Sequence, residues 1–256
     1  MIYKRVAANL RGQNWSAIGI EFAIVVAGVF VGTQVSNWNA GRLEKRETQR
    51  MIGQLGPTLK GLTDYYRAAR GYYTTTRNYA GTAIAGWRGD PTVSDSDFVI
   101  AAYQASQIFT LGTNSSTWST ILGTDQLRNI DDRQLRADLT YLMAADYSQI
   151  DNAAIDTPYR RNVRRIIPVE IQDLIRAQCG DRRVVGNENM LTLQRHCGLR
   201  IPAEQATMAA ALLRAHPDLL EDLQWHIAAT AALLSNIVPF ENAARRVEIE
   251  SSSGQR

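Results

Sequence analysis

One stretch of the sequence, from Trp15 to Trp38, constrains the fold more than any other. Across residues 18–35 the strongly polar side chains are Glu21 and Gln34 alone, and a run of that length and polarity is typical of one transmembrane helix. The two tryptophans are separated by about 35 Å of helix at about 1.5 Å per residue, so each ring can lie in a headgroup layer. The sequence therefore predicts a membrane anchor at residues 15–38, in contact with the lipid bilayer and preceded by a short basic lead at residues 1–14.

Three residues of the predicted anchor share one face. Gly28 and Gly32 have the G-x-x-x-G spacing that lets a second helix pack closely. Glu21 precedes Gly28 by seven residues, which places it within about 20° of the same stripe. An ionisable side chain at this depth usually faces a protein partner or water. We therefore expect Glu21, Gly28 and Gly32 to form a helix-packing face; the alternative is that Glu21 is hydrated near the interface and the glycines are incidental.

The anchor could instead be a signal peptide that is removed. Lys4, Arg5 and Arg11 would form its basic region, but no small-x-small cleavage site follows the apolar run at residues 35–38, so we expect it to be retained. The first 50 residues hold seven of the 28 basic and three of the 25 acidic side chains. The rest of the chain is close to neutral, which argues against nucleic acid as a partner.

Two cysteines indicate the compartment of the main domain. Cys179 and Cys197 flank a polar loop and predict a disulfide, although two free thiols in a cytoplasmic domain are the alternative. Lysine and arginine residues lie on both sides of the anchor and do not decide its orientation. Because disulfides persist in oxidising compartments, we expect a bacterial inner-membrane protein with a cytoplasmic N-terminus and a periplasmic domain at residues 39–250.

A long helix is expected to follow the anchor. Apolar and small residues alternate at spacings of three and four, which is typical of the seam of a helical bundle; they are Ile52, Leu55, Leu59, Leu62, Tyr66, Ala69, Tyr73, Thr76, Ala80, Ala83 and Trp87. We expect Pro57, with Gly53 and Gly56, to kink or interrupt this helix, and residues 86–91 to end it.

Five tyrosines lie in this helix, at positions 65, 66, 72, 73 and 79. They could form an aromatic binding face for a ligand or partner helix. We favour the interpretation that Tyr66 and Tyr73 belong to the seam while Tyr65, Tyr72 and Tyr79 border it, half-buried with their hydroxyls in water.

Capping residues and prolines mark the later helices. Starts are expected at Ser94 or Asp95, at Asp131 or Asp132, at Thr157-Pro158, after Pro168, at Ile201-Pro202 and at Pro217. The second helix should extend to Leu111, and a short element should hold Trp118, Ile121 and Leu122. The last helix should reach Glu248, bend at Pro239 and leave a flexible tail at residues 251–256. With no strand alternation in the sequence, the predicted fold class is all-α: one transmembrane helix followed by a helical bundle.

A basic run, Arg160, Arg161, Arg164 and Arg165, covers one face of the helix that begins at Pro158. Such a face could hold a phosphate group, an anionic headgroup or an acidic partner. We favour a solvated face with surface ion pairs.

Motifs that would support chemistry are missing from the sequence. The candidate zinc ligands Cys179, His196, Cys197, His216 and His226 have no paired spacing, and a disulfide would remove two of them. There is no phosphate loop, dinucleotide fingerprint or nucleophile with a marked base. We expect no catalytic residues, no metal, no cofactor and no enzymatic activity.

Two stretches resemble an uncharacterised family of bacterial single-pass membrane proteins. The first, residues 24–39, ends in Gln34-Val-Ser-Asn-Trp-Asn39 and is similar to a family span ending in Gln-Val-x-Asn-Trp-Asn. The second, residues 123–139, is similar to a Ser-Gly-x-Leu-x-x-Ile-x-Asp-x-x-Leu-Arg segment, with Leu122 where the family has a small polar residue. The resemblance implies an N-terminal anchor and a helical extramembrane domain, and it implies no catalytic or ligand-binding residue.

The sequence favours an accessory or scaffold subunit of a larger membrane complex, docked through its glycine face and its helical domain. The expected partners are other integral membrane subunits, with self-association through the same glycines as the alternative. The main rival is a periplasmic ligand-binding or sensory bundle that signals through a partner, because few residues precede the anchor. A ligand-sized apolar pocket between the helices would favour that rival.

Overall fold

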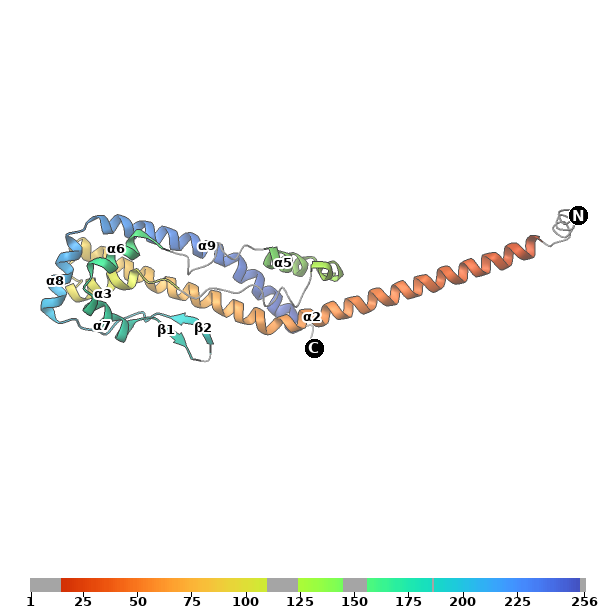
Figure 1. Cartoon of the computed structure of the whole chain (residues 1–256), viewed down its shortest axis with the longest axis horizontal. Helices are drawn as coiled ribbons and strands as arrows, with labels where there is room; N and C mark the ends of the chain where they lie inside the picture. The colour runs from red at the N-terminus through yellow and green to blue at the C-terminus, as the bar shows by residue number, and fades with distance from the viewer. Residues whose placement is uncertain (1–14, 110–123, 145–155, 186, 254–256) are drawn as a thin grey trace, which may run out of the picture. The chain divides into compact units, whose positions relative to one another are not determined.

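The computed structural model describes residues 15–109, 124–144, 156–185 and 187–253, and every structural statement below concerns these residues. The chain divides into two compact units, Met1–Arg50 and Met51–Arg256, which are described separately. The described residues are mainly helical, as expected, and the elements of the second unit appear in Figure 1.

The first element, α2, is a single helix, Trp15–Trp87. It passes through Pro57 without ending, so the predicted interruption there is wrong. The physical reason is that Pro57 lies on the exposed side of the helix, where the loss of one backbone hydrogen bond is tolerated, while Leu55 and Leu59 on either side are fully buried. Packing of these neighbours outweighs the intrinsic cost of the proline.

The seam predicted for residues 52–87 is the buried side of α2. Its buried members are Ile52, Leu55, Leu59, Tyr66, Ala69, Tyr73, Thr76, Ala80 and Ala83, and Leu62 and Trp87 are half-buried. The spacing of three and four residues therefore identified the core face of the helix correctly.

A tight connection joins α2 to α3, Asp95–Ala105. Gly89 adopts a left-handed φ of 74°, and the Ser94 hydroxyl caps α3 by accepting a hydrogen bond from the Asp97 amide at 3.1 Å. An added Cβ at Gly86 would come within 2.2 Å of the Phe98 ring, so the two helices meet closely here. The helix ends at Ala105, before the predicted Leu111, and each of its residues from Phe98 onward is buried.

The later elements begin near the residues that the sequence indicated. They are a 3₁₀ turn, η1, Thr124–Asn129, and the helices α5, Arg133–Ala144, α6, Pro158–Ile166, α7, Val169–Cys179, α8, Ala203–Arg214, and α9, Asp218–Ser253. Asp132 accepts a hydrogen bond from the Leu135 amide at 2.8 Å, and Thr157 caps α6. The predicted element containing Trp118, Ile121 and Leu122 lies outside the described residues.

Helix α9 runs antiparallel to the second-unit part of α2, as Figure 1 shows. Glu241 of α9 accepts a hydrogen bond from Arg70 at 3.0 Å, and Ser251 lies against Gly56, so the sequence positions run in opposite directions. The helix contains Pro239 and extends to Ser253. Residues 251–253 are therefore helical and not part of a flexible tail, whereas residues 254–256 are outside the described part.

Two short antiparallel strands, β1 (Arg182–Val184) and β2 (Asn187–Thr192), were not predicted. They lie inside the loop closed by Cys179 and Cys197, whose sulfur atoms are at bonding distance and whose Cα atoms are 5.5 Å apart. The strands escaped prediction because they are short and polar, so no apolar alternation marks them. The predicted disulfide pairing agrees with this geometry.

Candidate functional site

The apolar part of α2 has the dimensions of a membrane span. Among the described residues, one helix contains an 18-residue stretch that is long and apolar enough to cross a membrane, with a mean hydropathy of 1.9. None of that stretch is buried within the chain, unlike the core helix of a soluble protein. Phe22 is 70% exposed and Val25 63% exposed. An unburied apolar stretch of this length near the N-terminus is typical of a membrane span or of a signal sequence.

The predicted packing face is open. The side chain of Glu21 is exposed, and an added Cβ at Gly28 or Gly32 would meet no atom within 4 Å. Trp38 is also exposed, and the Arg42 guanidinium lies 5.8 Å from its ring centroid. Helix α2 begins at Trp15, whose side chain is outside the described part of the structure. Within the described part of the chain, Glu21 is therefore exposed, and Gly28 and Gly32 face open space.

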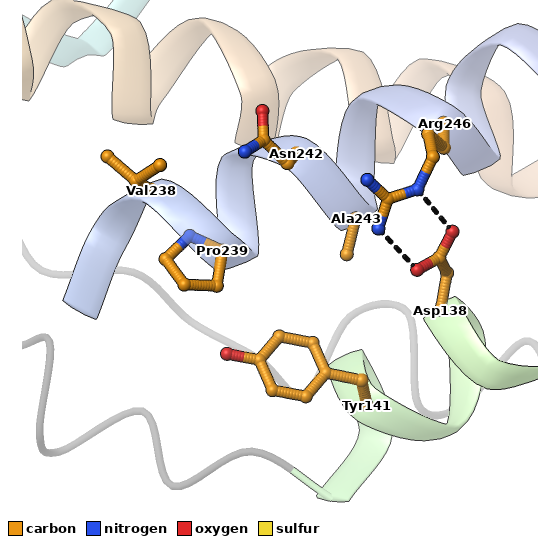
Figure 2. A pocket seen from close by; sticks show the side chains of 7 residues that line it. All are labelled: Asp138, Tyr141, Val238, Pro239, Asn242, Ala243 and Arg246. Atoms are coloured by element: carbon orange, nitrogen blue, oxygen red, sulfur yellow. Dashed lines mark hydrogen bonds and ion pairs between the residues drawn. The ribbon is translucent and has the colours of Figure 1, made fainter. Parts of the chain in front are cut away.

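A groove lies between α5 and α9 in the second unit (Figure 2). Its volume is about 390 Å³, and it is lined by Asp138, Tyr141, Val238, Pro239, Asn242, Ala243 and Arg246. Tyr141 extends from α5 toward Pro239, and its ring centroid is 4.9 Å from that of Phe240. Asp138 and Arg246 close one end with a two-pronged ion pair.

The ion pair at the groove is well formed. Arg246 donates to Asp138 through Nε at 2.7 Å and through Nη2 at 2.6 Å, while the Gln134 amide donates to the same carboxylate at 3.2 Å. These hydrogen bonds hold the pKa of Asp138 below its usual value, against the opposing effect of burial. The Asp138 carboxylate thus accepts hydrogen bonds from Arg246 and Gln134. The polar end of the groove is therefore better suited to connecting α5 with α9 than to binding a ligand.

The tyrosines of α2 are more buried than expected. Tyr65, Tyr72 and Tyr79 are 4%, 2% and 8% exposed, so the expectation that they are half-buried with solvated hydroxyls is wrong. The Tyr79 hydroxyl donates to the carbonyl of Gln194 at 2.9 Å, and the rings of Tyr65 and Tyr72 both meet Phe109 edge-on. These segments cover the tyrosines, and burial raises the pKa of Tyr72 and Tyr73 well above the usual value. The tyrosines form core and do not present an aromatic binding face.

The arginine run of α6 divides into two pairs. Arg161 is exposed and lies 3.4 Å from Asp156, and Arg165 is exposed, as the solvated interpretation requires. Arg160 and Arg164 are half-buried and donate to the segment that follows α3, so for them that interpretation is wrong. Helical spacing could not predict that these two side chains point toward the segment after α3. Ser106, which both of them contact, is 58 residues away from Arg164 in the sequence.

Histidine and metal chemistry have little geometric support. His226 is buried, with Nδ1 2.7 Å from the Thr157 hydroxyl, and burial together with the charge of Arg160 lowers its pKa to about 4. Within the described ranges, no three His, Cys, Asp or Glu side chains gather closely enough to hold a metal ion. His226 is best described as a neutral core histidine.

Comparison with known proteins gives no match. No protein-family model matches the chain, and neither a curated protein nor a solved structure is similar to it at a significant level. The resemblance to single-pass membrane proteins therefore stays a prediction based on residues 24–39 and 123–139.

Proposed function

We propose that the protein is a non-enzymatic, single-pass inner-membrane protein that acts as an accessory or scaffold subunit of a larger membrane complex. The observation that carries the proposal is the open face of α2 formed by Glu21, Gly28 and Gly32. An acidic side chain in an apolar span is costly unless it meets a protein partner or water, and small residues at this spacing favour a close helix partner. The second unit supplies a large extramembrane surface for the same complex.

The proposed orientation places the second unit in the periplasm. Support comes from the disulfide between Cys179 and Cys197, because such bonds persist in oxidising compartments. The N-terminal basic lead then lies in the cytoplasm. The proposed partners are other integral membrane subunits, and the bilayer contacts the remaining faces of the span.

Site-specific photo-crosslinking in cells tests this proposal. Val25 lies about 40° from Glu21 around the helix, whereas Val26 lies about 140° away, so the two valines offer a matched pair on different faces. A photoreactive residue at Val25 should give a discrete crosslinked band with a different protein, and one at Val26 should give mainly lipid adducts. Equal yields at both positions, or a band containing only this chain, would refute a specific hetero-contact through this face.

A ligand-binding or sensory bundle remains the second proposal, because the volume of the α5–α9 groove falls in the range of small-molecule sites. At the polar end of the groove, Asp138 and Arg246 are paired with each other. An unpaired charged group there would support ligand binding better. The ligand proposal predicts a co-purifying small molecule, detectable by native mass spectrometry, that is lost when Asn242→Trp fills the groove.

A further inference from the structure

Two arginines of α6 are held by uncharged groups. Arg164 donates from Nε to the Ser106 hydroxyl at 3.1 Å and from Nη2 to the Gln107 side-chain oxygen at 2.8 Å. Arg160 donates from Nη1 to the Ser106 carbonyl at 2.7 Å. Ser106 and Gln107 are both buried, so both guanidinium groups converge on one short, fixed segment.

Tyr103 contacts both Arg164 and a third arginine, Arg176. The guanidinium carbon of Arg164 lies 4.8 Å from the centroid of the buried Tyr103 ring, and the Tyr103 hydroxyl accepts a hydrogen bond from Arg176 at 3.3 Å. Arg176 also pairs with Asp173. In the described ranges, neither Arg160 nor Arg164 lies within ion-pair distance of a carboxylate.

Arg160 and Arg164 are both half-buried, so the lack of a carboxylate partner is costly for them. Arg70, Arg214 and Arg246 each reach a carboxylate within 3.0 Å. Burial and the neighbouring charge of Arg160 lower the pKa of Arg164. Positive charge that is partly removed from water and not neutralised is costly, so an anion bound here would recover much of that cost.

The other ionisable groups at this place do not supply the missing charge. Asp181 is exposed and accepts a hydrogen bond from the Tyr72 hydroxyl at 3.4 Å. His226, which faces Arg160, is neutral at physiological pH. Each guanidinium has five N–H donors, of which Arg164 uses two and Arg160 one on protein acceptors.

We propose that Arg160 and Arg164 form a binding site for a phosphate group. At pH 7 a phosphate group carries about −1 charge as a diester and about −1.5 to −2 as a monoester, and its oxygens can accept hydrogen bonds from both guanidinium groups at once. Arg is also the side chain best suited to two-pronged contact with phosphate oxygens. The phosphate group belongs either to a free phosphate compound or to an anionic phospholipid headgroup. This site is independent of the docking face on α2.

The test uses the full chain in phosphatidylcholine nanodiscs. Inorganic phosphate, titrated calorimetrically at constant ionic strength, should bind with a Kd in the micromolar to millimolar range. At ten times the Kd it should raise the Tm by about 3–6 °C. Arg160→Gln should weaken phosphate binding at least tenfold, and Arg161→Gln on the exposed side of the same helix should bind as the native chain does.

A second arm identifies the source of the phosphate group. Nanodiscs containing phosphatidylglycerol should raise the Tm of the native chain, but not of Arg160→Gln, if the site takes a lipid headgroup. Arg160→Gln removes one hydrogen bond to a backbone carbonyl, so its own Tm without phosphate should fall by only a few degrees. The proposal is overturned if neither phosphate at about 10 mM nor the anionic lipid binds, or if Arg160→Gln binds as tightly as the native chain.

Discussion

The Asp138–Arg246 pair should stabilise the second unit by joining α5 to α9. Asp138→Asn removes the charge of a side chain that is only 7% exposed, and it leaves Arg246, which is 48% exposed, without its carboxylate. Hydrogen bonds to charged groups each contribute about 1.5–3 kcal/mol, but the exposure of Arg246 and the remaining amide oxygen reduce the loss. We expect the free energy of unfolding to fall by about 1–3 kcal/mol at pH 7.

The effect should depend on pH in a defined direction. The pKa of Asp138 is lowered in the folded chain from an ordinary value of 3.8, chiefly by the hydrogen bonds from Arg246. The contribution of Asp138 to the free energy of unfolding is therefore fully present at pH values above the unfolded-state pKa. It is lost as the pH falls through the lower folded-state pKa. The difference between the native chain and Asp138→Asn should shrink below about pH 4.

Urea unfolding of the full chain in mild detergent, followed by tryptophan fluorescence, measures this difference. Asp156→Asn is the matched control, because Asp156 and Arg161 form an ion pair in which both side chains are more than 60% exposed. The control should change the free energy of unfolding by less than about 0.5 kcal/mol. Equal effects of the two substitutions, or a difference that grows at low pH, would show that the Asp138–Arg246 pair does not stabilise the second unit.

Three further perturbations probe other parts of the second unit. Gly86→Ala should destabilise it by about 1–3 kcal/mol through overpacking, whereas Gly81→Ala, whose added methyl meets nothing, should be neutral or stabilising in urea unfolding. Reduction of the Cys179–Cys197 bond should cost about 3 kcal/mol from loop entropy, and Tm measured with and without reductant would show no difference if the thiols are free in the cell. His226→Gln should flatten the pH dependence of stability between about pH 6.5 and 4, where the unfolded state binds a proton and the folded state does not; an unchanged slope would contradict a buried neutral histidine.

The spacing of apolar residues and the capping residues were sufficient to predict most of the helices from the sequence. The seam of α2 repeats over ten turns, and caps such as Ser94 and Thr157 act through residues three positions away, so both are visible locally. Proline marked several helix starts, but Pro57, which was expected to kink or interrupt α2, lies inside it. Pro239 lies inside α9, where the helix was expected to continue. At Pro57, burial of the neighbouring leucines outweighs the lost hydrogen bond.

Contacts across the fold could not be predicted in the same way. Asp138 and Arg246 are 108 residues apart, and nothing in either local sequence marks the other as a partner. Burial of Tyr79 depends on a segment 115 residues later, and the inward direction of Arg164 depends on Ser106. Spacing identifies the face of a helix, but the elements that cover that face are set by tertiary packing.

In the proposed function, the chain joins a larger membrane complex through the face of α2 that holds Glu21, Gly28 and Gly32. Extraction of the tagged protein from its native membrane in polymer nanodiscs, followed by mass spectrometry, tests it against two variants. Gly28→Ile/Gly32→Ile changes the proposed face, and Gly19→Ile, about 160° from Glu21, changes the opposite face of the same span. Stoichiometric membrane partners should be recovered with the native chain and with Gly19→Ile, and they should be lost from the double variant. A lone monomer or homodimer in all three samples would contradict it.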